Sequence, residues 1–396
     1  MERYICLQPE YTGQFQCDGA RCQSRCCRDW GVTLDDASIE KYRNIENRAE
    51  REEILSHVRR TEAWLVIELR ENGWCAFLGE DYLCRLQKKY GEEYLSCTCR
   101  TFPRMIYLLD GMLERSLSLA CPVAAELILS GGSPMAFEQV EVQVDEPVVV
   151  RRPQPSEYQG SILEIQYTCI SLLQDRRFSL DGRLALLGSF LEQVQGGGSV
   201  DALAGFYTSE ELPRHAHGFF QAMEFHREPW AESMAELMEA VHAREREQSQ
   251  EDLLLEHVGR RMGMEESTEI FRRGLRAFSE GEYSGRRAVL MEHAGAVLEN
   301  FLVHEFFLNI YPFRVPGTLL QNFHVFLLGW KLLEFLLVAG EAEAEGRLRE
   351  VLRDYAYRMD HTATYMACMK GMAMQREMGL ASMLNSLLEA GRMQDG

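Results

Sequence analysis

The sequence predicts a mainly α-helical protein, in which a cysteine-rich N-terminal metal-cluster module with short strands precedes an all-helical C-terminal domain. Nine of the twelve cysteines lie between Cys17 and Cys121, so this part forms one functional unit. From Ser161 onward apolar residues recur at spacings of three and four, with breaks at Gly or Pro. A chain of 396 residues has room for both parts. The expected boundaries are 1–135 for the cysteine-rich module, 136–160 for a strand and Pro-punctuated linker, and 161–396 for the helical domain.

Local patterns define the elements expected in the cysteine-rich module. The run "TLDDASIEKYRNI" starts with an N-cap residue, Thr33 or Asp35, and continues with apolar residues at helical spacing. Residues 61–79 mix β-branched and aromatic side chains with a glycine turn, which predicts a strand or short hairpin. The Asp-Gly pair at 110–111 between two apolar stretches indicates a hairpin. Residues 121–132 predict a helix that ends at glycines.

The rest of the chain is expected to be a linker followed by helices. Residues 131–155 hold an alternating, strand-like run and then several prolines. Beyond them the helical pattern covers 161–175, 182–195, 234–259, 296–313 and 319–340. No period of 20–50 residues repeats, so a solenoid is not predicted.

Charge and composition limit the classes of partner. The 42 basic and 61 acidic residues give a formal net charge of −19, which argues against a nucleic-acid backbone as partner and suits a basic or lysine-bearing protein substrate. The first residues lack the basic start and apolar run of a secretory signal, so we expect a cytoplasmic protein. The most apolar stretch, 326–340, carries Lys331 and Glu334 and predicts a buried helix, not a membrane span.

The cysteine spacings favour a metal or cluster over disulfides. Cytoplasmic thiols stay reduced unless a metal holds them. Structural zinc sites use pairs of cysteines with two to four residues between them, whereas Cys75 and Cys84 have eight residues between them and Cys97 and Cys99 only one. An iron–sulfur cluster accepts more irregular spacing, because its ligands can come from separate loops. Zinc remains the alternative metal.

Individual cysteines differ in what their positions predict. Adjacent side chains diverge by roughly 100° on a helix and point to opposite faces of a strand. We therefore expect Cys26 and Cys27 not to bind one metal side by side, so that one ligates while the other packs, or each serves a different metal. Cys6, Cys169 and Cys368 lie outside the cluster and are expected to be small buried hydrophobes.

Several stretches of the sequence resemble the flagellin lysine N-methylase family. In the first half they are "FQCDGARCQSRCCRDWGVTLD", "WCAFLGEDYLCRLQKKYGEEYLSCTCRTFPRM" and "SLACPVAAELIL". In the second half they are "LENFLVHEFFLNIYPFRV", "FHVFLLGWKLLEFLLVAG" and "YAYRMDHTATYMACMKGM". The cysteine region is also similar to that of zinc- or iron-chelating cysteine-cluster proteins.

The resemblance implies an enzyme that moves methyl groups from S-adenosylmethionine to lysine ε-amines of flagellin and depends on a cysteine-bound [4Fe–4S] cluster. Carried over position by position, the implied ligands are Cys17, Cys22, Cys26, Cys27, Cys75, Cys84, Cys99 and Cys121. Cys97 matches no expected family cysteine. Eight candidates exceed the four ligands of one cluster, so some support the others or two metals bind. No G-x-G-x-x-G follows a strand, so the donor site is left unplaced.

Other residues are weaker candidates. Arg100 and Arg104 in "CRTFPR" are expected to bind a carboxylate or phosphate of a cofactor near the cluster, or to form a structural ion pair. His304 and Tyr311, with Arg314, are candidates for a substrate groove, although an aromatic residue at a helix end usually belongs to the core. Asp360 and His361 form a candidate acid–base pair, but adjacent residues on a helix do not face each other.

Two function classes follow. The first is the cluster-dependent protein lysine methyltransferase. The second is a non-catalytic zinc or iron chelator that acts as a metal-handling or interaction module. The large helical half favours the methyltransferase, because a chelator needs no such domain. Ferredoxin-like electron transfer is disfavoured because the cysteine spacings differ from the usual ones.

Overall fold

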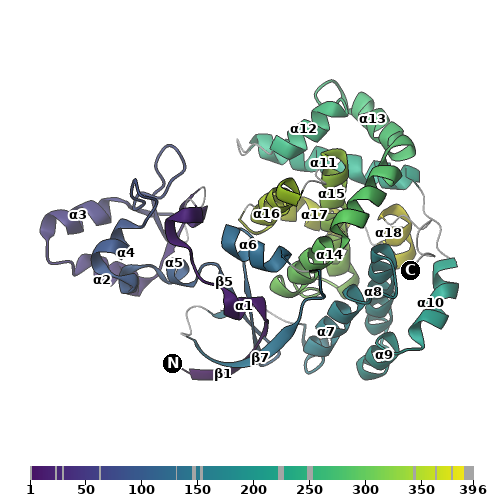
Figure 1. The fold of residues 1–396 in the computed structure, drawn as a ribbon, viewed down its shortest axis with the longest axis horizontal. Helices are drawn as coiled ribbons and strands as arrows, with labels where there is room; N and C mark the ends of the chain where they lie inside the picture. The colour runs from purple at the N-terminus through teal and green to yellow at the C-terminus, as the bar shows by residue number, and fades with distance from the viewer. Residues whose placement is uncertain are drawn as a thin grey trace. The chain divides into compact units, whose positions relative to one another are not determined.

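The computed structural model of the chain divides into two compact units (Figure 1). The N-terminal unit comprises residues 1–127 and 136–152, and the helical unit comprises residues 128–135 and 153–396. The structure describes residues 2–22, 25–28, 31–61, 64–130, 132–144, 149–151, 155–221, 227–247, 253–341, 345–361, 364–375 and 378–387. Helices dominate the described residues, as the sequence predicts.

A five-stranded mixed sheet forms one part of the N-terminal unit. Its strands, in spatial order, are β7 (Phe137–Val144), β1 (Glu2–Pro9), β6 (Met112–Leu117), β5 (Arg104–Leu109) and β8 (Val149–Arg151). β1 pairs antiparallel with β7 along its whole length and parallel with β6. β5 pairs antiparallel with β6 and parallel with β8. Part of the segment expected as strand and linker thus supplies the two outer strands of this sheet.

The β5–β6 hairpin confirms the Asp-Gly signal. Asp110 and Gly111 have φ values of 46° and 85°, which is the left-handed backbone that a two-residue hairpin turn requires. Cys6 of β1 is fully buried against Ile106 and Leu113, so it is the small core hydrophobe that the sequence predicts. Burial raises the pKa of its thiol to about 11.

The cysteine-bearing part of the N-terminal unit is built from short elements. They are α1 (Tyr11–Gln14), η1 (Gly19–Cys22), η2 (Arg25–Cys27), β2 (Thr33–Leu34), α2 (Asp36–Arg43), α3 (Arg48–Ser56), β3 (Val58–Arg60), β4 (Leu65–Ile67), α4 (Arg85–Tyr90), η3 (Glu92–Tyr94), α5 (Cys97–Thr101) and α6 (Pro122–Leu129). β2, β4 and β3 form a small antiparallel sheet. The helix expected at 121–132 and the strand expected within 61–79 are confirmed as α6 and β4.

The described part of the helical unit contains helices and no strand. After the turn η5 (Ser156–Tyr158) come α7 (Ile162–Leu173), α8 (Leu180–Gln195), α9 (Val200–Tyr207), α10 (Leu212–Gln221), α11 (Arg227–Glu247), α12 (Leu253–Arg261), α13 (Thr268–Gly281), α14 (Tyr283–Leu308), α15 (Leu319–Ala339), α16 (Glu345–His361), α17 (Thr364–Gln375) and α18 (Leu380–Leu387). Cys169 and Cys368 are buried in its core, as expected.

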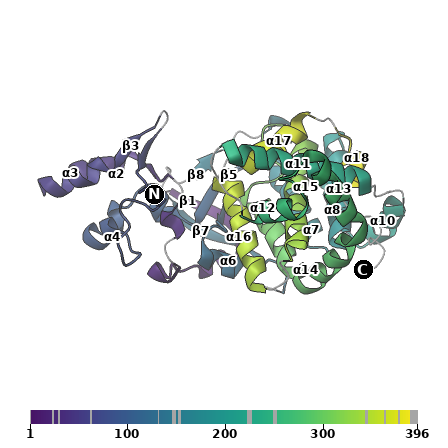
Figure 2. The same cartoon turned by 90° about the horizontal axis from the view of Figure 1, so that it is seen from above.

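Helix α15 is the central element of the helical unit. It packs against α8, α14 and α17, and both views show it surrounded by the other helices (Figures 1 and 2). Its length and composition would also suit a membrane span, but its apolar window is entirely buried within the protein, and the core helix of a folded domain passes the same test. Thr318 and Gln321 start the helix with a reciprocal capping box.

A buried network of four charged side chains joins α8, α14 and α15. Arg287 donates to Asp181 at 2.9 Å and to Glu334 at 2.9 Å. Lys331 bonds to Glu334 and lies 3.5 Å from Asp181. All four side chains are at most 6% exposed, and the hydroxyl of Tyr283 donates to Glu334 at 2.8 Å. Two positive and two negative charges balance, which is what makes their burial tolerable.

Candidate metal centre

Two stretches of the N-terminal unit bring their cysteines together through backbone pairing. Isolated antiparallel bridges join Arg28 to Trp74 and Leu78 to Cys84. The N–H of Cys75 donates to the carbonyl of Cys27 at 2.8 Å. The segment around Cys27 and the hairpin that carries Cys75 and Cys84 are therefore held side by side, although about fifty residues separate them in the sequence.

The hairpin between Cys75 and Cys84 is tight. The N–H of Gly79 donates to the Leu83 carbonyl at 2.8 Å, and the N–H of Arg85 donates to the Phe77 carbonyl at 2.8 Å. A Cβ at Gly79 would lie 2.6 Å from an Asp81 carboxylate oxygen and 3.1 Å from the Leu83 carbonyl oxygen. Only glycine therefore allows the chain to turn here without moving its neighbours.

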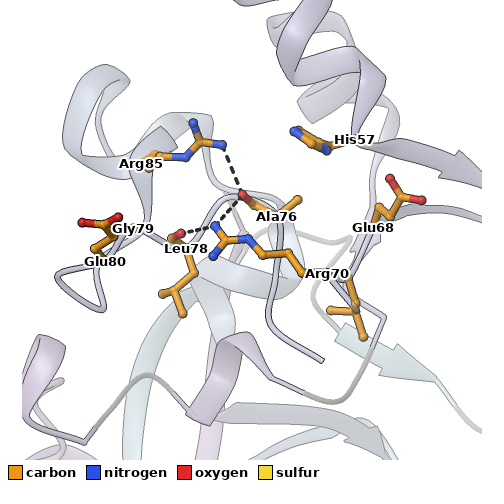
Figure 3. A pocket seen from close by; sticks show the side chains of 9 residues that line it. His57, Glu68, Arg70, Ala76, Leu78, Gly79, Glu80 and Arg85 are labelled. Atoms are coloured by element: carbon orange, nitrogen blue, oxygen red, sulfur yellow. Dashed lines mark hydrogen bonds between the residues drawn. The ribbon is translucent and has the colours of Figure 1, made fainter. Parts of the chain in front are cut away.

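Two arginines fix the carbonyls of this hairpin beside a pocket of about 460 Å³ (Figure 3). Arg70 donates to the carbonyl of Ala76 at 3.0 Å and also to that of Leu78, and Arg85 donates to Ala76 at 3.1 Å. The charge of Arg70 also favours the thiolate of Cys75. These cations hold the loop that follows Cys75 in place.

Helix α5, which carries Cys97 and Cys99, is anchored to α2 through Asp35. One carboxylate oxygen of Asp35 accepts from the N–H of Ser38 at 2.9 Å, which caps α2 as the sequence predicts. The other accepts from the N–H of Cys97 at 2.7 Å. The hydroxyl of Ser96 accepts from the N–H of Cys99 at 3.1 Å. Burial raises the pKa of Asp35, but the hydrogen bonds from Cys97 and Ser38 outweigh it and lower that pKa.

Replacing Asp35 by alanine is expected to destabilise the N-terminal unit by about 1–2 kcal/mol, because α2 and α5 each lose a bond at their first turn. Calorimetric unfolding of the full chain measures this loss. The matched control is Asp36→Ala, since Asp36 is exposed in the first turn of the same helix and is not the cap. Equal melting temperatures for the two variants would contradict the anchoring role.

Three thiols are in direct contact. The side chain of Cys27 shares hydrogen bonds with those of Cys26 and Cys75. Because Cys27 keeps the shared proton, these bonds raise its pKa and lower the pKa of Cys26, and they lower the pKa of Cys75 to about 7. The two adjacent thiols are thus in hydrogen-bond contact, and the expectation that they do not bind one metal side by side stays a prediction. Cys26 and Cys27 lie in the single turn η2, and the next residue, Arg28, forms the isolated bridge with Trp74.

Four further cysteines lie around this trio. Burial raises the pKa of Cys84, Cys99 and Cys121, charge on Cys75 and Cys26 raises the pKa of Cys84 and Cys99 further, and charge on Cys22 and Cys26 raises that of Cys121 further. Burial is the largest cause in all three, and it raises the pKa of Cys99 to about 12 and that of Cys121 to about 11. Charge on Cys26 thus affects the pKa of all three of these thiols. Cys17 is exposed, and Cys97 is partly buried.

The donors that gather here are all thiols at the edge of an apolar core. Cys75 belongs to a buried cluster that includes Tyr42 and Phe77, and Cys27, Cys84 and Cys99 pack against it. In the part of the chain that the structure describes, no three His, Cys, Asp or Glu side chains are arranged to hold one metal ion. A single zinc ion needs its ligands to converge on one point, whereas each thiolate of a [4Fe–4S] cluster binds a different iron. The donor chemistry fits a cluster, and the metal-cluster part of the fold prediction stays a prediction.

The arginine candidates lie close to this region in the sequence. Arg100 is in the last turn of α5 and is partly buried. Arg104 starts β5, and its guanidinium lies 5.1 Å from the centre of the Phe15 ring. Their role in cofactor binding stays a prediction.

The candidates of the helical unit do not form one group. His304 is fully buried in α14, and burial lowers its pKa to about 3, so it is neutral near pH 7. Tyr311 is 2% exposed and packs on Phe326, with ring centres 5.1 Å apart, while Arg314 lies over its ring. These positions suit a core role, and a catalytic role stays a prediction. Asp360 and His361 are in α16, but their side chains lie outside the described residues.

Sequence reasoning did not single out the network of Asp181, Arg287, Lys331 and Glu334. Its signal was present, because Lys331 and Glu334 interrupt an otherwise apolar helix and must be paired when that helix is buried. Their partners come from α8 and α14 and cannot be identified from spacing within one helix.

Comparison with known proteins identifies relatives of this chain. The chain is 30% identical over 209 residues to a lysine-N-methylase of Salmonella choleraesuis (strain SC-B67), which is 52% of this chain and 51% of that protein. It is 29% identical over 209 residues to the lysine-N-methylase of Salmonella typhimurium (strain LT2), with the same coverage. It is 34% identical over 142 residues to the flagellar biosynthetic protein FliU of Salmonella muenchen, which is 35% of this chain and 84% of that protein.

The chain spans about half the length of the lysine-N-methylases that it matches. No solved structure matches it. The model of the FliB lysine N-methylase C-terminal domain matches residues 166–387, which lie in the helical unit and make up more than half of the 396 residues. The family resemblance of the sequence is therefore confirmed, and the chain belongs to the FliB lysine N-methylase family.

Proposed function

We propose that this protein is a protein lysine N-methyltransferase that transfers methyl groups from S-adenosylmethionine to lysine ε-amines of flagellin and depends on a [4Fe–4S] cluster. Family membership carries the proposal, because the relatives are lysine-N-methylases and a flagellar biosynthetic protein. The acidic net charge of −19 supports a lysine-bearing substrate, since it attracts basic protein segments.

The thiols of the N-terminal unit would hold the cluster. Cys27 is in hydrogen-bond contact with both Cys26 and Cys75, and Cys84 and Cys99 pack on the same core. Four of these thiols suffice for one cluster, and the remaining ones would support them by hydrogen bonds to sulfur. When bound, a cluster supplies Lewis-acidic, redox-active iron.

The proposed reaction forms an N–C bond and breaks a C–S bond. The lone pair of the lysine nitrogen attacks the sulfonium methyl group, S-adenosylhomocysteine leaves with the electron pair of the C–S bond, and the nitrogen then releases a proton. A lysine amine has an ordinary pKa near 10.4, so the enzyme must desolvate or deprotonate it before attack. Holding amine and methyl in line then makes the step effectively unimolecular.

The experiment is anaerobic purification of the full chain, with iron, sulfide and zinc quantified, a visible spectrum recorded, and labelled S-adenosylmethionine supplied with flagellin. We expect about four iron and four sulfide per chain and label on flagellin lysines. Zinc without iron, together with unlabelled flagellin, would favour the alternative, a zinc- or iron-chelating protein that acts as a metal-handling or interaction module. Labelled flagellin in an iron-free preparation would show that methyl transfer does not need the cluster.

A further inference from the structure

A second charged site lies in the helical unit, apart from the cysteines. A cavity of about 560 Å³ opens between the start of α8 and the middle of α14. Its walls are formed by Arg176, Ser179, Leu180, Asp181, Arg183, Arg287, Ala288, Met291, Gly295, Ala296 and Glu299. A volume in this range suits a small organic ligand.

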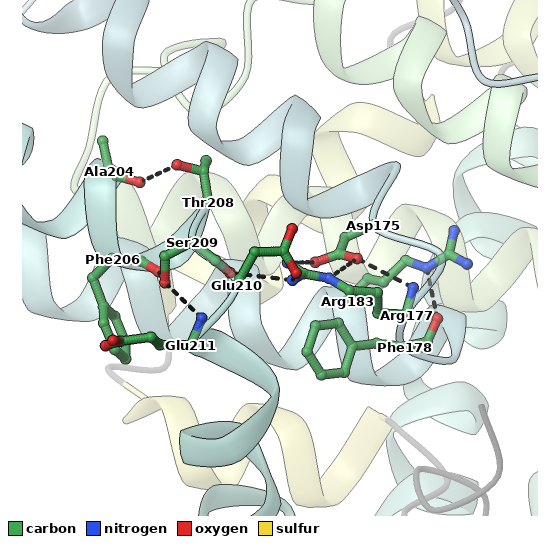
Figure 4. Close-up of polar contacts among 10 residues, drawn as sticks. All are labelled: Asp175, Arg177, Phe178, Arg183, Ala204, Phe206, Thr208, Ser209, Glu210 and Glu211. Atoms are coloured by element: carbon green, nitrogen blue, oxygen red, sulfur yellow. Dashed lines mark hydrogen bonds and ion pairs between the residues drawn. The ribbon is translucent and has the colours of Figure 1, made fainter.

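The turn before α8, which leads into the cavity-lining residues Ser179 to Arg183, is held by several polar contacts (Figure 4). Arg183 donates to the Phe178 carbonyl at 2.8 Å and to the Leu173 carbonyl at 3.1 Å. Arg177 pairs with Asp175 at 2.8 Å and with Glu210 at 3.2 Å, which ties the same turn to the loop before α10. The backbone that carries the cavity's arginines is thus fixed before any ligand arrives.

The charges on the wall do not balance. Glu299 is paired with both Arg183, at 2.6 Å, and Arg176, at 2.9 Å, so one carboxylate serves two cations. The network of Asp181, Arg287, Lys331 and Glu334 behind the wall is neutral by itself. Among the charged side chains that line the cavity and the network behind it, positive charges exceed negative charges by one, at Arg176 and Arg183.

Each arginine of the wall keeps donor capacity. The hydrogen bonds found among the described residues use Nε and Nη2 of Arg176, and Nε and Nη1 of Arg183. Nη1 of Arg176 and Nη2 of Arg183 are left to donate. A ligand carboxylate there would accept charge-assisted hydrogen bonds from the two arginines. The carboxylates of Asp181 and Glu299 on the same wall can accept from a ligand ammonium group.

The remaining wall is small and apolar. Ala288, Met291, Gly295 and Ala296 lie on α14. A Cβ added at Gly295 would meet no atom within 4 Å, so the space beside it is open. This side of the cavity has room for the uncharged body of a ligand whose charged end meets the arginines.

We infer that this cavity binds the α-amino-acid end of a small zwitterionic ligand and, on the function proposed above, that this ligand is S-adenosylmethionine. Its carboxylate meets Arg176 and Arg183, and its ammonium meets the carboxylates of Asp181 and Glu299. The cavity lies within the residues that the family model matches. The inference gives the methyl donor a site in the helical unit.

The test measures binding of S-adenosylhomocysteine to the full chain by isothermal titration calorimetry. Gly295→Leu fills the open space beside α14 and is expected to weaken binding tenfold or more. Gly285→Leu is the matched control, because Gly285 lies on the same helix, is exposed, and also has open space around it. It is expected to bind like the wild type. Equal affinity of the two variants would overturn the inference.

A second pair of measurements tests the charged end and does not depend on Gly295→Leu folding. Arg176→Gln changes a side chain that is 42% exposed, and we expect about tenfold weaker binding from the lost charged bond. 5′-Methylthioadenosine lacks the amino-acid end and is expected to bind about tenfold weaker than S-adenosylhomocysteine. Equal binding of these two compounds would overturn recognition of the amino-acid end.

Failure of the inference can be told from failure of the proposed function. If the wild type methylates flagellin and Gly295→Leu does so with an unchanged KM for S-adenosylmethionine, the donor binds elsewhere and the function stands. Loss of S-adenosylhomocysteine binding in a Cys26→Ser/Cys99→Ser variant, with binding kept in Gly295→Leu, would assign the donor to the cysteine region. If the wild type binds S-adenosylhomocysteine but methylates no lysine, the inferred binding site stands and the proposed function is overturned.

Discussion

Replacing Cys26 and Cys99 together by serine is expected to abolish the bound iron, the visible absorbance and the transfer of methyl groups to flagellin. Cys26 is in hydrogen-bond contact with Cys27, and its charge reaches Cys84, Cys99 and Cys121. Cys99 is the thiol that α5 contributes to this group of cysteines. Serine keeps the size of cysteine but binds iron poorly, because its hydroxyl is not ionised near pH 7.

The matched controls are cysteines that lie away from this group. Cys6→Ala changes a fully buried thiol in the sheet of the same unit, and Cys169→Ala changes one in the helical unit. Both are expected to keep full iron content and activity, with a stability loss of about 1 kcal/mol. Methyl transfer by an iron-free double serine variant would show that the thiols serve the structure and not the reaction.

Replacing Glu334 by glutamine is expected to destabilise the helical unit by about 3–5 kcal/mol, because Arg287 and Lys331 are then buried with one carboxylate between them. The change preserves shape, so the loss reports charge and not a cavity. Chemical unfolding followed by circular dichroism measures it. Glu350→Gln, an exposed change on α16, is the control and should stay within about 0.5 kcal/mol of the wild type.

A double variant tests whether charge balance is the cause. Lys331→Met/Glu334→Gln leaves Arg287 and Asp181 as a balanced pair at 2.9 Å, so it should be more stable than Glu334→Gln alone. An additive or larger loss would contradict the account, because it would mean that each side chain contributes independently of its charge.

The same network makes the helical unit sensitive to acid. Burial alone would raise the pKa of Glu334, but the charges of Arg287 and Lys331 outweigh it and lower that pKa to about 2. Because the folded-state pKa lies below the ordinary 4.5, this stabilisation is complete above about pH 4.5 and is lost as the pH falls toward 2. The wild type should lose stability over this range more steeply than Glu334→Gln.

Local features of the fold were predictable because their causes are local. Asp35 caps α2 by bonding to a residue three positions on, and the Asp110-Gly111 turn needs only its own two residues. The burial of Cys6, Cys169 and Cys368 follows from their apolar surroundings. Such signals are complete within a few residues, and the structure confirms them.

Long-range pairing was not predictable from one sequence. The alternating run at 137–144 indicates a strand, but nothing in it says that its partner is β1. The contact of Cys27 with Cys75 joins two segments that are about fifty residues apart, which local spacing does not reveal. The charged cavity was not predictable for the same reason, because α8 and α14 meet only in the folded protein.

The position of β1 between β6 and β7 has a consequence for biosynthesis. β1 is translated before its full-length partner β7, which ends at Val144, after all eight candidate ligand cysteines from Cys17 to Cys121. On the ribosome the chain therefore presents all eight of those thiols before the five-stranded sheet can close. Synthesis from the N-terminus makes the thiols available before β7 can complete the sheet, an order that pulse-labelling of nascent chains can test.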